Sequence, residues 1–221
     1  MVAVGAQGPP VLAFTPAQPP VDREPTGSAV GIDRAVATSV AISTGQHLRA
    51  PHSGKADRKA GKLAARMSRQ HRGSNRRHAS RQAVGKVHTR AADRRKDWVD
   101  KTSTALVRDH DVIVLEDLRV QNMVRRPAPK PDPSQDGVFL ANRARAKAGL
   151  NRSIHRSCWG LLGRVEDKAS ASGVTVVTVN PAYTSVGCRA CGLTEPGNRK
   201  SQAVFRCLAC GHCNHADTHA A

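Results

Sequence analysis

Aromatic residues are scarce in this chain, since Phe, Trp and Tyr make up 3% of its 221 residues. A hydrophobic core must therefore be built mainly from Val, Leu, Ile and Ala, and it cannot extend through the whole chain. The sequence also has no stretch that approaches 18 consecutive apolar residues, which excludes a membrane-spanning helix. The N-terminus lacks a basic start followed by a continuous apolar run, which argues against a secretory signal.

Acidic residues are also few, with 17 Asp and Glu against 35 Lys and Arg and a formal net charge of +18. A charge of this size indicates a polyanionic partner, of which nucleic acid is the commonest. An anionic membrane surface is the competing partner, but no amphipathic helix with bulky aromatics supports it. Because no secretory signal is indicated, the six cysteines should stay reduced and are expected to bind metal rather than form disulfides.

The first part of the chain divides by composition near residue 28. Residues 1–27 contain six prolines and one basic residue, and we expect a Pro-rich tail with no fold of its own. The segments SAVGID and AVATSVAIS then predict two short strands joined by a tight turn around Asp33 and Arg34.

Positive charge is concentrated in residues 49–96, which contain 16 Lys and Arg and two Asp, a net charge of +14. Apolar residues at helical spacing predict one helix through Ala60 to Met67 and a second through Val84 to Leu106, with a break at 73–75. The charge is too one-sided for internal ion pairing, so a phosphate-binding surface is favoured over a merely solvated face. The candidate contacts in the centre of this segment are Arg66, Arg69, Arg72, Arg76, Arg77, Arg81 and Lys86.

The next segments alternate between strand and helix patterns. DVIVLEDL predicts a buried strand from Val112 to Leu115, and the prolines of 125–137 predict a loop or lid. Residues 142–172 have a helical pattern that ends at Gly173, and VTVVTV at 174–179 predicts another short buried strand. This alternation indicates a mixed α/β sheet.

Four cysteines have the spacing of a zinc ribbon: Cys188-x2-Cys191-x15-Cys207-x2-Cys210. Each Cys-x-x-Cys turn brings two thiolates to one ion, and two such turns complete a tetrahedron. Four thiolates make a closed, structural site with no position for a catalytic water. Cys213, His212 and His215 remain alternative ligands, and Cys158 is expected to be a small buried hydrophobe.

Three acids occur at suggestive places. Asp33 ends the first strand, Glu116 ends VIVLE, and Asp217 follows the cysteines in HAD. Carboxylates at adjacent strand ends, joined by a third from a helix, can hold two divalent cations about 4 Å apart for phosphodiester cleavage. By spacing alone this pattern is equally compatible with acids that have no catalytic role.

The amino-acid sequences of three longer segments resolve that ambiguity. The segments VGIDRAVA, STALVRDHDVIVLEDLRVQNMV, and NPAYTSVGCRACG through FRCLACGHCNHADTHAA resemble the three nuclease blocks and the inserted zinc ribbon of the TnpB family, over residues 28–221. TnpB proteins are transposase-like accessory proteins of bacterial insertion sequences and are similar to type V CRISPR effector nucleases. The resemblance implies a RuvC-like, ribonuclease-H-type α/β fold with long basic helices and a small zinc ribbon.

The same resemblance implies a function and a set of site residues. It implies a magnesium-dependent DNA endonuclease, directed by a guide RNA, that acts in transposition, in the prokaryotic cytoplasm, with DNA and RNA as partners and no membrane or small-molecule substrate. Asp33, Glu116 and Asp217 match the catalytic metal-binding acids, and Cys188, Cys191, Cys207 and Cys210 match the zinc ligands. Tyr183, Thr184 and Ser185 fall in the PAYTS block, where we interpret them as strand-positioning residues, with a structural turn as the alternative.

The resemblance also predicts a domain order and some departures. We expect a nuclease core at 28–182 with a basic helical insertion at about 49–108, a ribbon at 183–213, and the last nuclease motif at 214–221. Relatives carry an N-terminal module and a longer last helix, so we expect a truncated copy, with Ala35 where Gly is common and His219 where Asn is usual. The alternative function is therefore a catalytically inactive nucleic-acid-binding remnant. A stand-alone zinc-ribbon transcription factor ranks last, because it leaves the two acidic strands unexplained.

Overall fold

The computed structural model describes residues 23–35 and 38–221. Most of the expected Pro-rich tail, residues 1–22, lies outside the described residues. The next residues, 23–27, contact Asp111, which immediately precedes the strand Val112–Glu116. The carboxylate of Asp111 accepts hydrogen bonds from the backbone N–H groups of Thr26 and Gly27, and pairs with Arg23.

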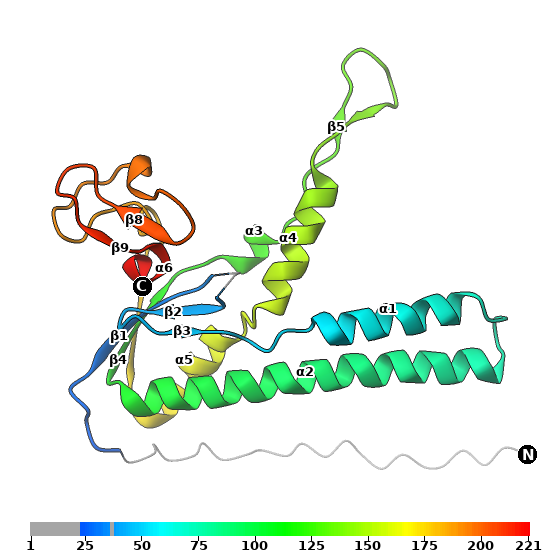
Figure 1. Ribbon diagram of the computed structural model, residues 1–221, viewed down its shortest axis with the longest axis horizontal. Coiled ribbons are helices and arrows are strands. Elements are labelled where there is room, and N and C mark those ends of the chain that lie inside the picture. Colours follow the sequence, from blue (N-terminus) through cyan, green and yellow to red (C-terminus); the bar gives the residue numbers. More distant parts are fainter. Residues whose placement is uncertain (1–22, 36–37) are drawn as a thin grey trace, which may run out of the picture.

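A five-stranded mixed sheet forms the centre of the fold, in the spatial order β3-β2-β1-β4-β7 (Figure 1). β1 is parallel to β4, β4 is parallel to β7, and the β1-β2-β3 side is antiparallel. The strands are β1 Ala29–Asp33, β2 Val40–Ile42, β3 His47–Leu48, β4 Val112–Glu116 and β7 Thr175–Val179. Because β1 and β4 are parallel neighbours, their last residues, Asp33 and Glu116, come to the same edge of the sheet. The predicted α/β fold with a mixed sheet is confirmed.

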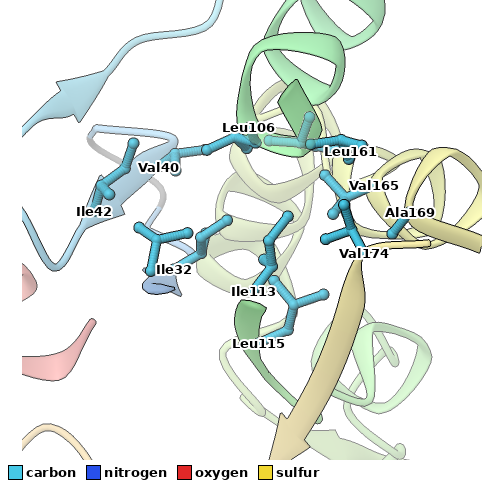
Figure 2. Packing of buried hydrophobic residues seen from close by; sticks show 12 residues of the cluster. Ile32, Val40, Ile42, Leu106, Ile113, Leu115, Leu161, Val165, Ala169 and Val174 are labelled. Atoms are coloured by element: carbon cyan, nitrogen blue, oxygen red, sulfur yellow. The ribbon is translucent and has the colours of Figure 1, made fainter. Parts of the chain in front are cut away.

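The core lies between this sheet and two helices, α2 (Asn75–Asp109) and α5 (Leu161–Ser172). Alternate residues of each strand point toward the helices, as period-2 burial requires. Figure 2 shows the strand residues facing the helix residues across this layer. The buried cluster consists of Val30, Ile32, Val40, Ile42, Leu106, Val107, Ile113, Leu115, Leu161, Val165, Ala169 and Val174. As the composition predicted, it is built from Val, Leu, Ile and Ala, and the partly buried Trp98 packs against it.

The two predicted basic helices form an antiparallel hairpin of α1 (Gly54–Ser68) and α2. At 35 residues, α2 is about 52 Å long, and its outer half extends past the sheet together with α1 (Figure 1). The break between them falls at the predicted place, because Ser74 caps the first turn of α2 by accepting a hydrogen bond from Arg77 N.

Two predictions about the middle of the chain were wrong. The helical pattern of 142–172 forms two helices, α4 (Ala144–Arg156) and α5, rather than one. Cys158 has a left-handed backbone with φ of 56° and Gly160 follows it, so the helix cannot continue through this turn. The Pro-rich segment after the short α3 (Val120–Met123) is not simply a loop: β5 (Lys130–Pro131) pairs with β6 (Phe139–Leu140) in a projecting hairpin (Figure 1).

β7 also differs from the prediction of a buried strand. It is at the edge of the sheet, and Val177 and Val179 remain 41% and 37% exposed on the face away from the helices. Its apolar run is explained on one face by Val176, which packs against the core. As expected, Gly173 ends α5 and Cys158 is buried.

The C-terminal region forms a small ribbon above the sheet, with the short helix α6 (Ala216–Ala220) between the two (Figure 1). The ribbon contains η1 (Pro196–Asn198) and the antiparallel pair β8 (Val204–Arg206) and β9 (Cys213–His215). Its own buried cluster of Cys188, Phe205, Cys207 and Ala216 is separate from the core of the sheet. Among the described residues, no helix is both long and apolar enough to cross a bilayer.

Candidate metal centres and nucleic-acid interface

The four predicted zinc cysteines come together in the ribbon. Their sulfur atoms all lie within 4.8 Å of one another. The sulfurs of Cys188 and Cys210 are 3.7 Å apart, and those of Cys191 and Cys207 are 3.5 Å apart. Tetrahedral zinc with Zn–S bonds of about 2.3 Å requires sulfurs about 3.8 Å apart, so this donor set fits structural zinc. Cys213, His212 and His215 are not members of the cluster.

Backbone geometry explains why each cysteine pair can face inward. Gly192 and Gly211 follow the second cysteine of each pair, and both have positive φ, at 77° and 71°. The N–H of each glycine donates to the carbonyl of the first cysteine of its pair, which closes the two turns. A residue with a Cβ would be strained in this conformation.

A second feature of the ribbon is the buried side chain of Asn198, which holds its loops together. Its Nδ2 donates to the carbonyls of Val186 and Leu193, and its Oδ1 accepts a hydrogen bond from Leu208 N. Asn198 is fully buried, so these bonds replace those it would make to water. The following residue, Arg199, is thereby placed at the underside of the ribbon, next to α6.

The three predicted catalytic acids come from three distant parts of the chain. Asp33 ends β1, Glu116 ends β4 and Asp217 lies in the first turn of α6. Asp33 and Asp217 are 8% and 3% exposed and line the same open cavity of about 490 Å³, together with Arg34, Arg199 and Gln202. Asp117, the neighbour of Glu116, lines a different cavity beside α3.

Electrostatics link the three carboxyl groups. Burial, and then the nearby charges of Glu116 and Asp217, raise the pKa of Asp33 from 3.8 to about 7. Arg199 and a backbone hydrogen bond act in the opposite direction. A cation beside these acids would favour the ionised form of Asp33. Carboxylate oxygens are the ligand type that a hard divalent ion such as magnesium prefers.

Two of these carboxylates accept hydrogen bonds from other side chains of the protein. The Thr184 hydroxyl donates to Glu116 Oε1 at 2.6 Å, and Arg199 donates to Asp217 Oδ1 at 2.8 Å. Among the described residues, the four cysteines are the only group of three or more His, Cys, Asp or Glu side chains that lies close enough together to hold a metal ion, so the three acids do not form such a group in this structure. Arg199 thus supplies a positive charge where the sequence predicts a metal ion.

Arg199 was missed by the sequence analysis because its pairing with Asp217 depends on the folding of the ribbon. No spacing rule links residues 18 positions apart on different elements. Arg34 was missed as well. Its guanidinium is buried, donates to Ser157 O at 2.6 Å and lies over the ring of Trp159, and burial lowers its pKa to about 10.

The predicted nucleic-acid contacts fall into two groups. Arg66, Arg69, Arg72, Arg76, Arg81 and Lys86 are exposed on the hairpin, and none of them forms an ion pair with a described residue. Arg77 differs from these, because its NH1 donates to the carbonyls of Met67 and Gln70 at the C-terminal end of α1. That contact ties the two helices together.

The residues of the PAYTS block lie between β7 and the ribbon. Tyr183 is 71% exposed with a left-handed backbone, and its carbonyl accepts hydrogen bonds from the N–H groups of Val186 and Gly187. Thr184 and Ser185 are half-buried, and Thr184 makes the contact with Glu116 described above.

The chain is similar to known proteins over most of its length. Residues 14–126 match the OrfB_IS605 family, described as "Probable transposase", and residues 160–221 match the Cas12f1-like TNB domain. It is 37% identical, over 199 residues, to the "Putative RNA-guided DNA endonuclease InsQ" of Escherichia coli K12, covering 89% of this chain and 48% of that protein. A Streptomyces pristinaespiralis protein, "Putative RNA-guided DNA endonuclease", is 40% identical over 101 residues, 45% of this chain and 25% of that one. The chain thus spans about half the length, or less, of these two curated relatives.

Solved structures show the same fold. A CRISPR-Cas12f ternary complex matches 94% of this chain and 40% of its own, with a TM-score of 0.54 and 17% identity. A Cas12f1-sgRNA-target DNA complex matches 91% of this chain and 50% of its own, with a TM-score of 0.52 and 17% identity. With residues 14–126 and 160–221 assigned, the chain belongs to the OrfB_IS605, or TnpB-type, transposase family and carries a Cas12f-like zinc domain.

Proposed function

We propose that this chain contains the nuclease centre of an RNA-guided DNA endonuclease of an insertion sequence, and that Asp33, Glu116 and Asp217 are its catalytic acids. The observation that carries the proposal is that these acids come from β1, β4 and α6 to one place, where burial of Asp33 and then the nearby charges of Glu116 and Asp217 raise the pKa of Asp33 to about 7. A cation bound there would favour the ionised form of Asp33 near neutral pH. The E. coli relative, described as an RNA-guided DNA endonuclease, supports the choice of substrate.

The three acids would hold magnesium at the edge of the sheet. Bound magnesium supplies charge neutralisation and activation of the attacking water in phosphodiester hydrolysis. Asp33 would contact the cation from β1, and Glu116 and Asp217 would contact it from β4 and α6. Thr184 fixes the orientation of Glu116 through its hydroxyl.

Arg199 has two roles in this proposal. It balances the charge of Asp217 in this structure. With a divalent ion at Asp217, the guanidinium of Arg199, which lines the same cavity, would be free to bind a phosphate oxygen of the substrate with its paired N–H donors.

The basic hairpin is the proposed surface for the nucleic-acid backbone. Its exposed arginines carry charge without acidic partners among the described residues, and contacts to phosphate read charge and shape rather than sequence. Zinc in the cysteine cluster is proposed to be structural, because all four ligand positions are taken by thiolates.

The experiment is cleavage of labelled single- and double-stranded DNA by the purified chain, with RNA transcribed from the flanking locus and with magnesium or EDTA. We expect cleavage that requires magnesium and is lost in Asp33→Asn, while binding of nucleic acid is kept. Asp117→Asn, at the neighbouring exposed carboxylate, is the matched control and should cleave normally. Cleavage that persists in Asp33→Asn would refute the catalytic assignment.

A protein that binds nucleic acid without cutting it is the second candidate function. Two observations favour it. Among the described residues, the three acids, unlike the four cysteines, do not lie close enough together to form a metal-binding group, and Asp217 pairs with Arg199. Salt-sensitive binding of DNA or RNA, with no cleavage by the unmodified chain in magnesium or manganese, would support this function over the first.

A further inference from the structure

The helix that carries Asp217 is held from two sides. α6 has five residues, which is too short to be stable without tertiary contacts. On the sheet side, the hydroxyl of Thr218 lies 3.0 Å from His47 Nε2 of β3. On the ribbon side the contacts are made by His219, which is 6% exposed.

His219 makes two close contacts with the ribbon, and its ring also lies 5.5 Å, between centroids, from that of His212. Its Nε2 is 2.8 Å from the carbonyl oxygen of Gly187, and because a carbonyl can only accept, Nε2 carries the proton and donates. Its ring stacks on Phe205, with centroids 3.5 Å apart and planes at 17°. Nδ1 has no hydrogen-bond partner among the described residues, which agrees with the neutral ring.

Both partners of His219 are next to zinc-cluster cysteines. Gly187 precedes Cys188, and Phe205 is two residues before Cys207 and packs with both cysteines in the same buried cluster. The position of these partners therefore depends on the cysteine turns being closed. His219 and Asp217 share one turn of α6, so a shift of His219 moves Asp217 with it.

We propose that His219 is a positioning residue that couples the cysteine cluster to the acids, so that zinc in the ribbon and a divalent cation at Asp33, Glu116 and Asp217 bind cooperatively. This inference rests on the proposed function, since it takes the three acids to be a cation site. Coupling of two binding sites is reciprocal, so each metal must raise the affinity for the other by the same factor.

His219 is thereby assigned a role that neither metal site explains by itself. His219 is not a member of the cysteine cluster, and a closed four-thiolate site needs no fifth ligand. Its ring also points its donor at the ribbon and away from the cavity that Asp33 and Asp217 line, since it is not among the residues of that cavity.

The test measures the magnesium affinity of the full chain by calorimetric titration, with zinc bound and after its removal by a chelator. Four proteins are compared: the unmodified chain, His219→Phe, His219→Gln and His47→Gln. His219→Phe keeps a ring on Phe205 but loses the hydrogen bond to Gly187. His219→Gln restores an amide donor, and His47→Gln alters the sheet-side contact of the same helix.

We expect zinc removal to weaken magnesium binding by about tenfold in the unmodified chain, within the usual range of coupling between sites. In His219→Phe magnesium should bind weakly with or without zinc, and the effect of zinc should fall below about twofold. His219→Gln should recover most of the coupling. His47→Gln should lower the affinity for magnesium while the effect of zinc is kept.

Two other results would overturn the proposal, and they differ. If magnesium binds and Asp33→Asn abolishes that binding, but the effect of zinc is unchanged in His219→Phe, the coupling through His219 is refuted and the cation site stands. If Asp33→Asn binds magnesium as well as the unmodified chain, the cation site itself is refuted, and the coupling with it.

A reciprocal measurement covers the case in which zinc removal disturbs the ribbon too broadly. Zinc affinity is determined by competition with a chromophoric zinc chelator, with and without magnesium, in the folded zinc-loaded chain. Magnesium should tighten zinc binding in the unmodified chain and in His219→Gln, and leave it unchanged in His219→Phe and Asp33→Asn. Equal zinc affinities with and without magnesium in the unmodified chain would overturn the proposal.

Discussion

At the scale of single residues, the proposed cation site depends on Asp33. Its carboxyl is buried at the end of β1 beside two other acids, an arrangement that works against folding and that the proposed cation site would explain. Residues of this kind lower the stability of the folded chain in return for a chemical function.

Asp33→Asn should therefore stabilise the zinc-loaded chain at alkaline pH in the absence of magnesium. The pKa of Asp33 in the folded chain, about 7, is above its ordinary value of 3.8, so the unmodified chain loses stability as pH rises through this interval. At pH 8, with zinc bound and no magnesium added, the substitution should raise the free energy of unfolding by at least about 1 kcal/mol, or Tm by about 2–4 °C. The gain should vanish at pH 4, where Asp33 is protonated, and a thermal melt at each pH measures it. A lower Tm at pH 8 would show that the carboxylate is not repelled by its neighbours.

Thr184→Val should show whether Thr184 positions Glu116 for cleavage or contributes to nucleic-acid binding. The substitution removes the hydroxyl that donates to Glu116 and keeps the branched shape of the side chain. We expect DNA cleavage to fall about tenfold, as for the loss of one hydrogen bond of about 1.4 kcal/mol, with nucleic-acid affinity unchanged. Ser185→Ala, next in the chain, is the control. A loss of affinity without a loss of cleavage rate would instead support the role in strand positioning that the sequence suggested.

Single residues also show where sequence reasoning reached its limit. The cysteine spacing predicted the four-sulfur cluster because both pairs are local turns, and the glycines that follow them fit the observed backbone. The contacts of Arg199 with Asp217 and of Thr184 with Glu116 join elements far apart in the chain. A pattern within one segment contains no information about such contacts.

At the scale of elements, the arginines of the α1–α2 hairpin have two different environments: one holds the two helices together, and others are exposed to solvent. Arg77 binds the C-terminal carbonyls of α1, whereas Arg66, Arg69 and Arg72 are exposed at the end of the hairpin. The same amino acid thus has two different roles within a few residues.

Replacing Arg66, Arg69 and Arg72 together with Gln should weaken nucleic-acid binding and reduce its dependence on salt. Each lost phosphate contact lowers the slope of log affinity against log salt by about 0.9 on duplex DNA, so a decrease of about 2 to 3 is expected. Fluorescence anisotropy over a range of salt concentrations measures the slope. Arg108→Gln, an arginine that pairs with Asp109 at the other end of α2, should leave it unchanged. A slope that is equal in the triple variant and the unmodified chain would place the nucleic acid elsewhere.

The elements that the sequence predicted best are those with local signals. The strands at Ala29–Asp33 and Val112–Glu116 and the break before Asn75 follow apolar runs and a capping serine. The division of 144–172 into two helices was missed because the positive φ of Cys158 is not visible in a helical apolar pattern. The exposure of β7 was missed because the position of a strand in the sheet order is a tertiary property.

At the scale of the whole molecule, two hydrophobic clusters meet at the proposed catalytic centre. The larger cluster holds β1 and β4, and the smaller one holds the ribbon, with Asp217 at the boundary between them. The geometry of the acids therefore depends on both clusters, although each is built from its own residues.

Zinc removal should unfold the ribbon and leave the sheet intact. The ribbon's cluster contains Phe205 and two of the four cysteines, so without the metal it has little apolar area of its own to bury. Hydrogen exchange should show loss of protection in 187–215 and full protection in β1 and β4. Exchange that increases throughout the sheet would mean that the two clusters unfold as one unit.

A divalent-cation site formed by Asp33, Glu116 and Asp217 can be located by anomalous scattering from a crystal of the zinc-loaded chain soaked in manganese. We expect an anomalous manganese peak among the three carboxylates, with Arg199 moved away from Asp217. Density that leaves Arg199 paired with Asp217 and shows no manganese among the acids would contradict it.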